Sequence, residues 1–350
     1  MRASSPDEIK QNNHIETAVS HLIAGSLHRA MRTASLHLSC ALPPAFFNAM
    51  PRLAGGLAFR TFCTPSLSRQ RSDDHDALVA RARFHLRLAR PVPVPTRSGV
   101  VIAHVLEPEG GTARASVLVV HGWTSEASFM MAIAEYLRRR RYRVVAPDLP
   151  AHGLSPGVRT SLIDCAHAVR EVAEALGPMS FAVGHSIGAL AVLLAGGGAR
   201  PMPRAYPFRA FALIASPNRF QNVTRRFGAE QRLSHASQLD FERRLERIAE
   251  RRIEAFTGVD LLHEAGQPAL LLHSRDDAEV AFADAEAIAA ACANATLEVY
   301  EDLGHRKILY ASQAVRAIGA FIDRQMADGN ESKSSTTEAE IKSNGPGSQP

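Results

Sequence analysis

The residues of this chain best suited to chemistry form the pattern GHSIG at 184–188, which follows an apolar strand-like run and precedes an apolar helical stretch. On a sharp turn from strand to helix, the hydroxyl of Ser186 is exposed at the end of a sheet and at the positive end of a helix dipole, where it can attack an acyl carbon. Gly184 and Gly188 fit this turn because a Cβ atom at either position would collide with the neighbouring strand or helix. The other interpretation of the pattern is an ordinary glycine-rich turn.

A second loop could hold the negative charge that such an attack creates. His121, Gly122 and Trp123 follow the apolar strand SVLVV. In enzymes that transfer acyl groups, a loop in this position donates a backbone N–H to the oxyanion, together with the N–H of the residue after the nucleophile. Those two donors would be Trp123 and Ile187. We expect a hydrogen bond from the His121 side chain to support this loop, with Gly122 beside it.

Acidic residues and a histidine follow two later strands. The segment HSRDDAEV at 273–280 places acids directly after a buried strand, where a carboxylate can orient a histidine. The segment at 303–305 follows the strand TLEVY and precedes the last predicted helix, which places His305 at the same edge of the sheet. The order along the chain is therefore serine, acid, histidine.

The elements that must position these residues alternate between strand-like and helix-like patterns. Such alternation predicts an α/β fold with a mostly parallel, doubly wound sheet covered by helices on both faces. The predicted strands are 100–105, 116–120, 143–146, 181–184, 211–215, 268–273 and 296–300. The predicted helices are 129–139, 162–176 opened by Ser161, 188–194, 283–292 and 311–326.

Five segments give the chain a resemblance to a known family. They are HGWTS at 121–125, PDLPAHGLS at 147–155, GHSIGA at 184–189, HSRDDAEV at 273–280 and DLGH at 302–305. Because these segments occur in the order and at the separations of the α/β-hydrolase fold family, the sequence resembles that family over about residues 85–326. We therefore expect a hydrolase domain at 83–326.

The resemblance implies a role for each member of a Ser-His-Asp triad. Ser186 is the nucleophile, His305 the general base and then acid, and an Asp after the seventh strand orients the imidazole. The family's pattern H-x-x-x-D-x-x-V selects Asp277 rather than Asp276 for that Asp. His152 and His185 are expected to position the loop and to pack beside the nucleophile, respectively.

The triad implies cleavage of a small-molecule carboxylic ester, or a related acyl bond, through an acyl-enzyme, with no cofactor and no metal. The same triad could instead cleave thioester, amide or C–C bonds or transfer an acyl group. An alternative from another class is that the chain is a non-catalytic member of the fold that serves as a binding module. Family members carry a cap between the sixth and seventh strands, which here corresponds to 217–258, a segment with nine Arg and six acids.

The segments at the two ends of the chain differ from the hydrolase domain. Residues 1–82 are predicted as a basic, partly helical extension with an amphipathic helix near 15–34, broken into short pieces after it by Pro and Gly. Between 17 and 72 there are six Arg and no acid. This segment could make peripheral contact with an anionic membrane surface, and the alternative is packing on the hydrolase domain. Residues 327–350 are polar and predicted as disordered.

Composition excludes several other classes of protein. The chain has 350 residues and a net charge of +5, and all of the excess lies within residues 1–72. The neutral remainder gives no support for a nucleic-acid partner. Four scattered Cys residues indicate neither a zinc site nor a disulfide framework. The polar start lacks the pattern of a signal peptide, so we expect a cytoplasmic protein, with the inner membrane surface as its only candidate membrane contact.

Overall fold

The structure is a computed structural model that describes residues 50–65, 82–198 and 200–343. The chain divides into two compact units, Met1–Pro51 and Arg52–Pro350. Nearly all of the first unit lies outside the described residues, and so does the helix predicted near 15–34.

The core of this unit is a mostly parallel sheet of eight strands in the order β1-β2-β4-β3-β5-β6-β7-β8. Only the pairs β1/β2 and β2/β4 are antiparallel. The strands are β1 Arg90–Thr96, β2 Gly99–Leu106, β3 Ser116–Val120, β4 Arg143–Pro147, β5 Phe181–His185, β6 Ala210–Ile214, β7 Ala269–Ser274 and β8 Ala295–Tyr300. The sheet therefore confirms the predicted fold class and each of the seven predicted strands to within two residues.

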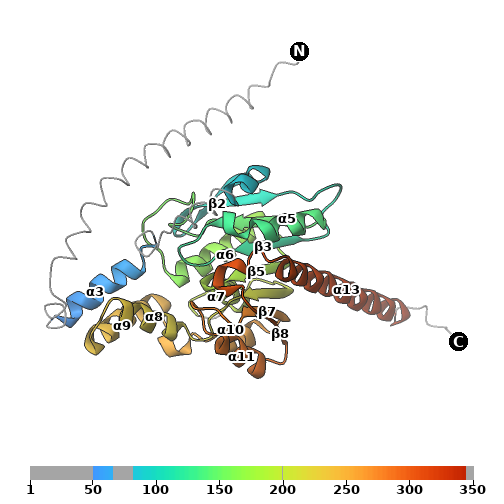
Figure 1. Cartoon of the computed structure of the whole chain (residues 1–350). Helices are drawn as coiled ribbons and strands as arrows, with labels where there is room; N and C mark the ends of the chain where they lie inside the picture. The colour runs from blue at the N-terminus through green and yellow to red at the C-terminus, as the bar shows by residue number, and fades with distance from the viewer. Residues whose placement is uncertain (1–49, 66–81, 199, 344–350) are drawn as a thin grey trace, which may run out of the picture. The chain divides into compact units, whose positions relative to one another are not determined.

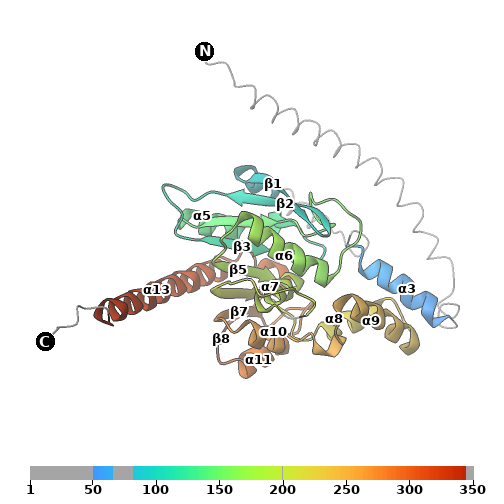
Figure 2. The same ribbon diagram turned by 180° about the vertical axis from the view of Figure 1, so that it is seen from behind.

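Helices cover both faces of the sheet, so that alternate residues of a buried strand enter two separate cores. In β3, Leu118 and Val120 belong to one core and Val117 and Val119 to the other. The first core is completed by α6 Leu162–Leu176, α7 Ile187–Gly197, α10 Gly258–Ala265 and α11 Phe282–Ala291. The second is completed by η4 Ala127–Met130, α5 Met131–Arg139 and α13 Ser312–Ser343. Figures 1 and 2 show these two layers from opposite sides.

The first strand, β1, was not predicted because its sequence is RPVPVPT. Proline lacks an N–H and is normally found only on edge strands. In an antiparallel pair, the N–H groups of one strand point alternately toward and away from its partner. Since Pro91, Pro93 and Pro95 occupy every second position of an edge strand, all three can lie on the side that needs no donor.

The helix α3, Pro51–Phe62, corrects another prediction. The prolines and glycines of this region predict short broken pieces, yet the helix runs without interruption through Gly55 and Gly56. The reason is tertiary packing, which overrides a weak helix propensity. Gly55 lies against α9, His235–Ala249, closely enough that a Cβ atom would come within 2.8 Å of Ser237 O.

The C-terminal segment also differs from its prediction. The last helix, α13, starts at Ser312 and extends to Ser343, so the backbone of 327–343 is helical rather than disordered. A helix that is already nucleated and packed can be extended by one hydrogen bond per residue, even through a polar sequence. Between β6 and β7, the described residues form α8 Phe220–Glu230, α9, η5 Ile253–Ala255 and α10. The first three of these lie within the predicted cap segment 217–258.

Within the described residues, no helix combines the length and the apolar character needed to cross a membrane.

Candidate active site

Ser186 lies on the turn between β5 and α7, where its backbone is strained. Its dihedral angles are φ 53° and ψ −122°, in the half of the Ramachandran plot that a residue with a side chain rarely adopts. The turn is possible because its two glycines lie against backbone: a Cβ atom on Gly184 would lie 2.6 Å from Ala189 Cα, and one on Gly188 only 2.3 Å from His121 O. Strain that neighbouring structure maintains in this way is typical of functional sites.

The structure brings His305 together with Asp277. Nδ1 of His305 lies 2.8 Å from Oδ2 of Asp277, and both side chains are buried. The other carboxylate oxygen of Asp277 accepts backbone hydrogen bonds from Glu279 at 2.8 Å and from Val280 at 2.9 Å. Burial raises the pKa of Asp277, but hydrogen bonds from His273 and His305 outweigh burial and hold the pKa below its usual value. The carboxylate is therefore charged at neutral pH and can fix the orientation of the imidazole.

The neighbouring acid, Asp276, has a different position. Its Oδ1 accepts hydrogen bonds from Gly304 N at 3.1 Å and from the hydroxyl of Ser274. It thus holds the loop that leads into His305 but does not contact the imidazole. The geometry agrees with the choice of Asp277 over Asp276 as the partner of His305.

Ser186 and His305 line one cavity of about 570 Å³. No hydrogen bond joins Ser186 Oγ to His305 in this structure, although both side chains face the same space. Such bonds are often loose in enzymes without a ligand and tighten when substrate binds. The cavity is bounded by residues 122–125 of the predicted oxyanion loop, by α8 of the cap and by residues 277–281 after β7, which we call the acid loop. Its lining also includes the rings of Phe62, Trp123, Phe129, Phe220 and Phe227.

The two predicted oxyanion donors border this cavity as well. Among the described residues, neither Trp123 N nor Ile187 N has a hydrogen-bond partner, and Ile187 is the first residue of α7, where N–H groups have no partner within the helix. The loop lies directly against the serine, because a Cβ atom built on Gly122 would be 3.2 Å from Ser186 Cβ. Both N–H groups are thus free to bind an oxyanion.

Two histidines hold the loop after β3 by hydrogen bonds. The Nδ1–H of His121 donates to Gly122 O at 2.7 Å, while its Nε2 accepts from Leu149 N at 3.0 Å. His152 accepts from Thr124 N at 3.2 Å and donates to Pro150 O at 2.9 Å. Burial lowers the pKa of His121, so this imidazole is neutral and holds one tautomer. These bonds join the loop after β3 to the loop after β4.

His185, next to Ser186 in sequence, packs against His305. Its Nε2–H donates to the backbone oxygen of His305 at 2.9 Å, and the two rings are 4.7 Å apart. Burial, followed by repulsion from His305, lowers the pKa of His185 well below its usual value. A neutral His185 therefore supports the loop of His305 without adding a charge to the site.

A family model confirms the resemblance inferred from the motifs. The model described as the alpha/beta hydrolase family matches residues 117–319, more than half of the chain. The chain belongs to the alpha/beta hydrolase family.

Relatives and solved structures with similar folds are hydrolases too. A pyrethroid hydrolase from Sphingobium wenxiniae is 33% identical over 79 residues, which are 22% of this hydrolase and only 28% of the relative's length. Est1E from Butyrivibrio proteoclasticus with ferulic acid bound has a TM-score of 0.55 at 18% identity, over 67% of this chain and 99% of that one. The Pyrococcus furiosus esterase has a TM-score of 0.51 at 18% identity, over 69% and 94%. At this identity, the two structures show a shared fold.

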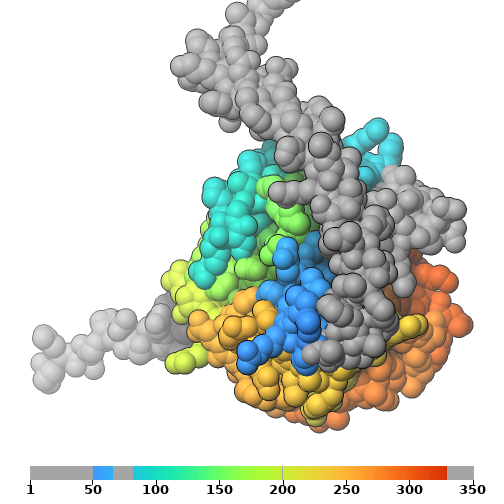
Figure 3. Space-filling view, turned by 90° about the vertical axis from the view of Figure 1, so that its left-hand side faces the viewer, coloured from blue at the N-terminus to red at the C-terminus, as the bar shows by residue number. Residues whose placement is uncertain are grey.

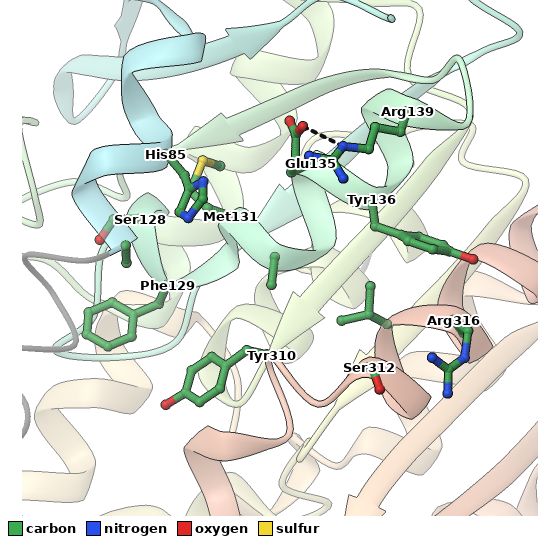
Figure 4. Close-up of a pocket in the computed structure, with 13 residues that line it drawn as sticks. His85, Ser128, Phe129, Met131, Glu135, Tyr136, Arg139, Tyr310, Ser312 and Arg316 are labelled. Atoms are coloured by element: carbon green, nitrogen blue, oxygen red, sulfur yellow. Dashed lines mark hydrogen bonds and ion pairs between the residues drawn. The ribbon is translucent and has the colours of Figure 1, made fainter.

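Another cavity of this hydrolase, about 720 Å³, lies between α5 and the start of α13. Figure 4 shows Met131, Tyr136 and Tyr310 along it, with Arg139 and Arg316 farther from Phe129. It shares only Phe129 with the cavity of Ser186 among the described lining residues. Its lining residue Ser128 donates its hydroxyl to the Glu126 carboxylate at 2.8 Å, and Arg83 also binds that carboxylate. The pair of His305 and Asp277 borders the smaller cavity.

The sequence analysis missed three residues that the structure places at the site of this hydrolase. Arg226 of α8 donates to Ala278 O at 2.7 Å and to Glu279 O at 2.9 Å, which ties the cap to the acid loop. The Glu279 carboxylate lies 3.9 Å from His305 Nε2. Phe62 of α3 lines the cavity. Arg226 and Phe62 belong to no motif, and of these two only the cap position of Arg226 gave a signal. Glu279 lies within the segment at 273–280, but the pattern of that segment gives a role only to Asp277. Within the described part of the chain, no group of three or more His, Cys, Asp or Glu side chains could hold a metal ion.

Proposed function

We propose that this alpha/beta hydrolase cleaves carboxylic esters through a Ser186-His305-Asp277 triad and an acyl-enzyme intermediate. The observation that carries the proposal is the strained Ser186 at the wall of a cavity that also holds a histidine oriented by a buried carboxylate. Membership of the family supports hydrolysis. The name of the pyrethroid hydrolase supports it as well, though only over a short segment of that relative.

In this mechanism, Ser186 Oγ attacks the carbonyl carbon while Nε2 of His305 accepts the hydroxyl proton. The negative charge that develops on the carbonyl oxygen is bound by the N–H groups of Trp123 and Ile187. The imidazolium then gives its proton to the departing alcohol, which leaves Ser186 acylated. Next, His305 takes a proton from water, the hydroxide attacks the acyl-enzyme, and the proton returns to Ser186 as the acid departs. Asp277 stays charged throughout and stabilises the imidazolium.

The direct test is hydrolysis of p-nitrophenyl butyrate by the full chain and by two serine variants. Ser186→Ala removes the nucleophile, and we expect its kcat to fall by about 10⁴-fold or more. Ser125→Ala is the matched control, because Ser125 lines the same cavity without belonging to the triad, and it should stay within about threefold of the wild type. Retained turnover in Ser186→Ala would overturn the proposed roles.

The same proteins, assayed with other acyl substrates, distinguish ester hydrolysis from the alternative functions. Turnover of thioesters, amides or C–C substrates with none of esters would assign a different reaction to the same triad. A folded protein that turns over no acyl substrate, and whose Ser186 reacts with no probe, would be the binding module.

For location, we propose a cytoplasmic protein in which the described part of segment 17–72 that belongs to the second unit, residues 52–65, contacts the hydrolase domain rather than a membrane. The described part of that segment supports packing, since Arg52 O accepts a hydrogen bond from Arg244 of α9 at 3.2 Å. Co-sedimentation with vesicles of anionic phospholipid tests this: we expect the full chain to stay in the supernatant, and pelleting with the vesicles would contradict it.

A further inference from the structure

Phe62 is an unexpected member of the cavity that holds Ser186. It lies at the end of α3, far ahead of residue 117, where the family match begins. Its side chain is 8% exposed and belongs to the same core as α7 and the cap. A residue outside the matched part of the family therefore helps to enclose the site.

Phe62 joins the oxyanion loop to the cap. Its ring stacks on Trp123, with centroids 5.8 Å apart and an interplanar angle of 20°. It also makes edge contacts with Phe220 at 6.2 Å and Phe227 at 5.1 Å, both of α8. Trp123, Phe220 and Phe227 line the cavity together with Phe62. Four aromatic rings thus form one continuous apolar wall beside the nucleophile.

The backbone around Phe62 is fixed from two sides. On one side, a Cβ atom on Gly55 would lie 2.6 Å from Asp240 Oδ2 of α9, so the two helices cross in close contact. On the other side, Cys63 O accepts a hydrogen bond from Thr160 N at 2.8 Å, just ahead of α6. Figure 3 shows α3, in blue, against the yellow and orange surface of the cap. With its backbone held at both ends, the ring of Phe62 has a defined position in the wall.

We propose that α3 is a third helix of the cap and that Phe62 sets the preference of the site for esters with a large apolar group. This inference rests on the proposed ester hydrolysis. A ring in this wall removes the apolar part of a long substrate from water, and it offers nothing to a substrate too short to reach it. The reacting atoms bind elsewhere, at Ser186, His305 and the oxyanion donors, so that Phe62 acts on recognition of the substrate.

The experiment compares kcat and KM for p-nitrophenyl acetate and p-nitrophenyl octanoate in the wild type, Phe62→Ala and Phe62→Leu. In Phe62→Ala we expect kcat/KM for the octanoate to fall about tenfold, mainly through KM, and that for the acetate to change by less than about twofold. Phe62→Leu should restore part of the loss. Phe84→Ala, which removes a ring that is 62% exposed and outside the cavity, should leave both ratios unchanged.

Trp123, the only tryptophan of the chain, reports directly on the stacked contact. Its fluorescence emission should shift to longer wavelength in Phe62→Ala and stay unchanged in Phe84→Ala. Equal losses for acetate and octanoate, an unchanged chain-length preference, or unchanged emission in Phe62→Ala would overturn the inference while ester hydrolysis stands. Absence of ester turnover in the wild type would overturn the proposed function, and this inference with it.

Discussion

Two regions enclose the cavity, and they are held together by different kinds of contact. Around Ser186, backbone lies against backbone, as where Gly188 meets His121 O with no room for a Cβ atom. In the cap, side chains make the contacts: the rings of Phe220 and Phe256 pack edge to face, and Thr224 of α8 donates to the Glu242 carboxylate of α9 at 2.8 Å. The difference teaches where each property of the hydrolase resides. Backbone contacts fix the turn of Ser186, the proposed nucleophile, whereas side chains of the cap shape the opposite wall of the cavity.

The largest effect should come from the pair Asp277 and Asp276, which are adjacent in sequence but have different contacts. We expect Asp277→Asn to lower kcat by about 10³- to 10⁴-fold, because an amide cannot stabilise the imidazolium of His305. Asp276→Asn should cost less than about tenfold, since Asp276 only supports the loop at Gly304. Steady-state kinetics with p-nitrophenyl butyrate measure both, and similar losses in the two variants would break the assignment.

Two glycine substitutions compare the two regions by stability. Gly188→Ala forces a methyl group against His121 O and should lower the free energy of unfolding by about 2–4 kcal/mol. Gly56→Ala, in α3, meets only the flexible end of Arg244, and an alanine in a helix should raise stability by about 0.5–1 kcal/mol. Urea denaturation gives both values. A tolerated alanine at 188 would show that the turn is not set by backbone contact.

The buried histidines of the catalytic region predict a dependence of stability on pH. The pKa values of His121 and His185 are lowered in the folded state, chiefly by burial, so below about pH 6.5 the unfolded chain takes up protons that the folded chain does not. The contribution of these two histidines to the free energy of unfolding is fully present above that pH. It is lost as the pH falls, by up to about 1.4 kcal/mol per pH unit for each histidine. Urea denaturation between pH 7 and about pH 5 measures the slope. His185→Gln should reduce it, and an identical slope in the variant would contradict the prediction.

The smallest effect is expected where the two regions are tied together. Arg226→Met removes the hydrogen bonds from α8 to Ala278 O and Glu279 O, and we expect kcat/KM for butyrate to fall about three- to tenfold. Arg225→Met, one residue earlier and exposed, is the control and should have little effect. If both variants behave alike, the tie between cap and acid loop has no role in turnover.

How far the sequence predicts the structure depends on the same distinction between regions. The turn at 184–188, the pairing of His305 with an Asp after β7 and the loop of His121 could be predicted, because each depends on a short local pattern with its own backbone requirement. Helix α6 was predictable to the residue because Ser161 and Asp164 form a capping box at its start.

Contacts between distant segments could not be read from the sequence. No local pattern shows that Gly55 will meet α9, and for this reason α3 was expected to be broken. The prolines of β1 argue against a strand. They are compatible with one only because β1 lies at the edge of the sheet, which the sequence does not show. The position of Phe62 at the cavity could not be predicted for the same reason, since only the packing of α3 on the cap brings its side chain there.

The most direct test of the central claim is covalent labelling of the folded full chain with a fluorophosphonate, followed by peptide mass spectrometry. The proposed triad predicts a single adduct on Ser186, formed within minutes and absent from Ser186→Ala and from heat-unfolded protein. An intact, folded chain in which Ser186 carries no adduct, or in which another serine reacts instead, would contradict the account.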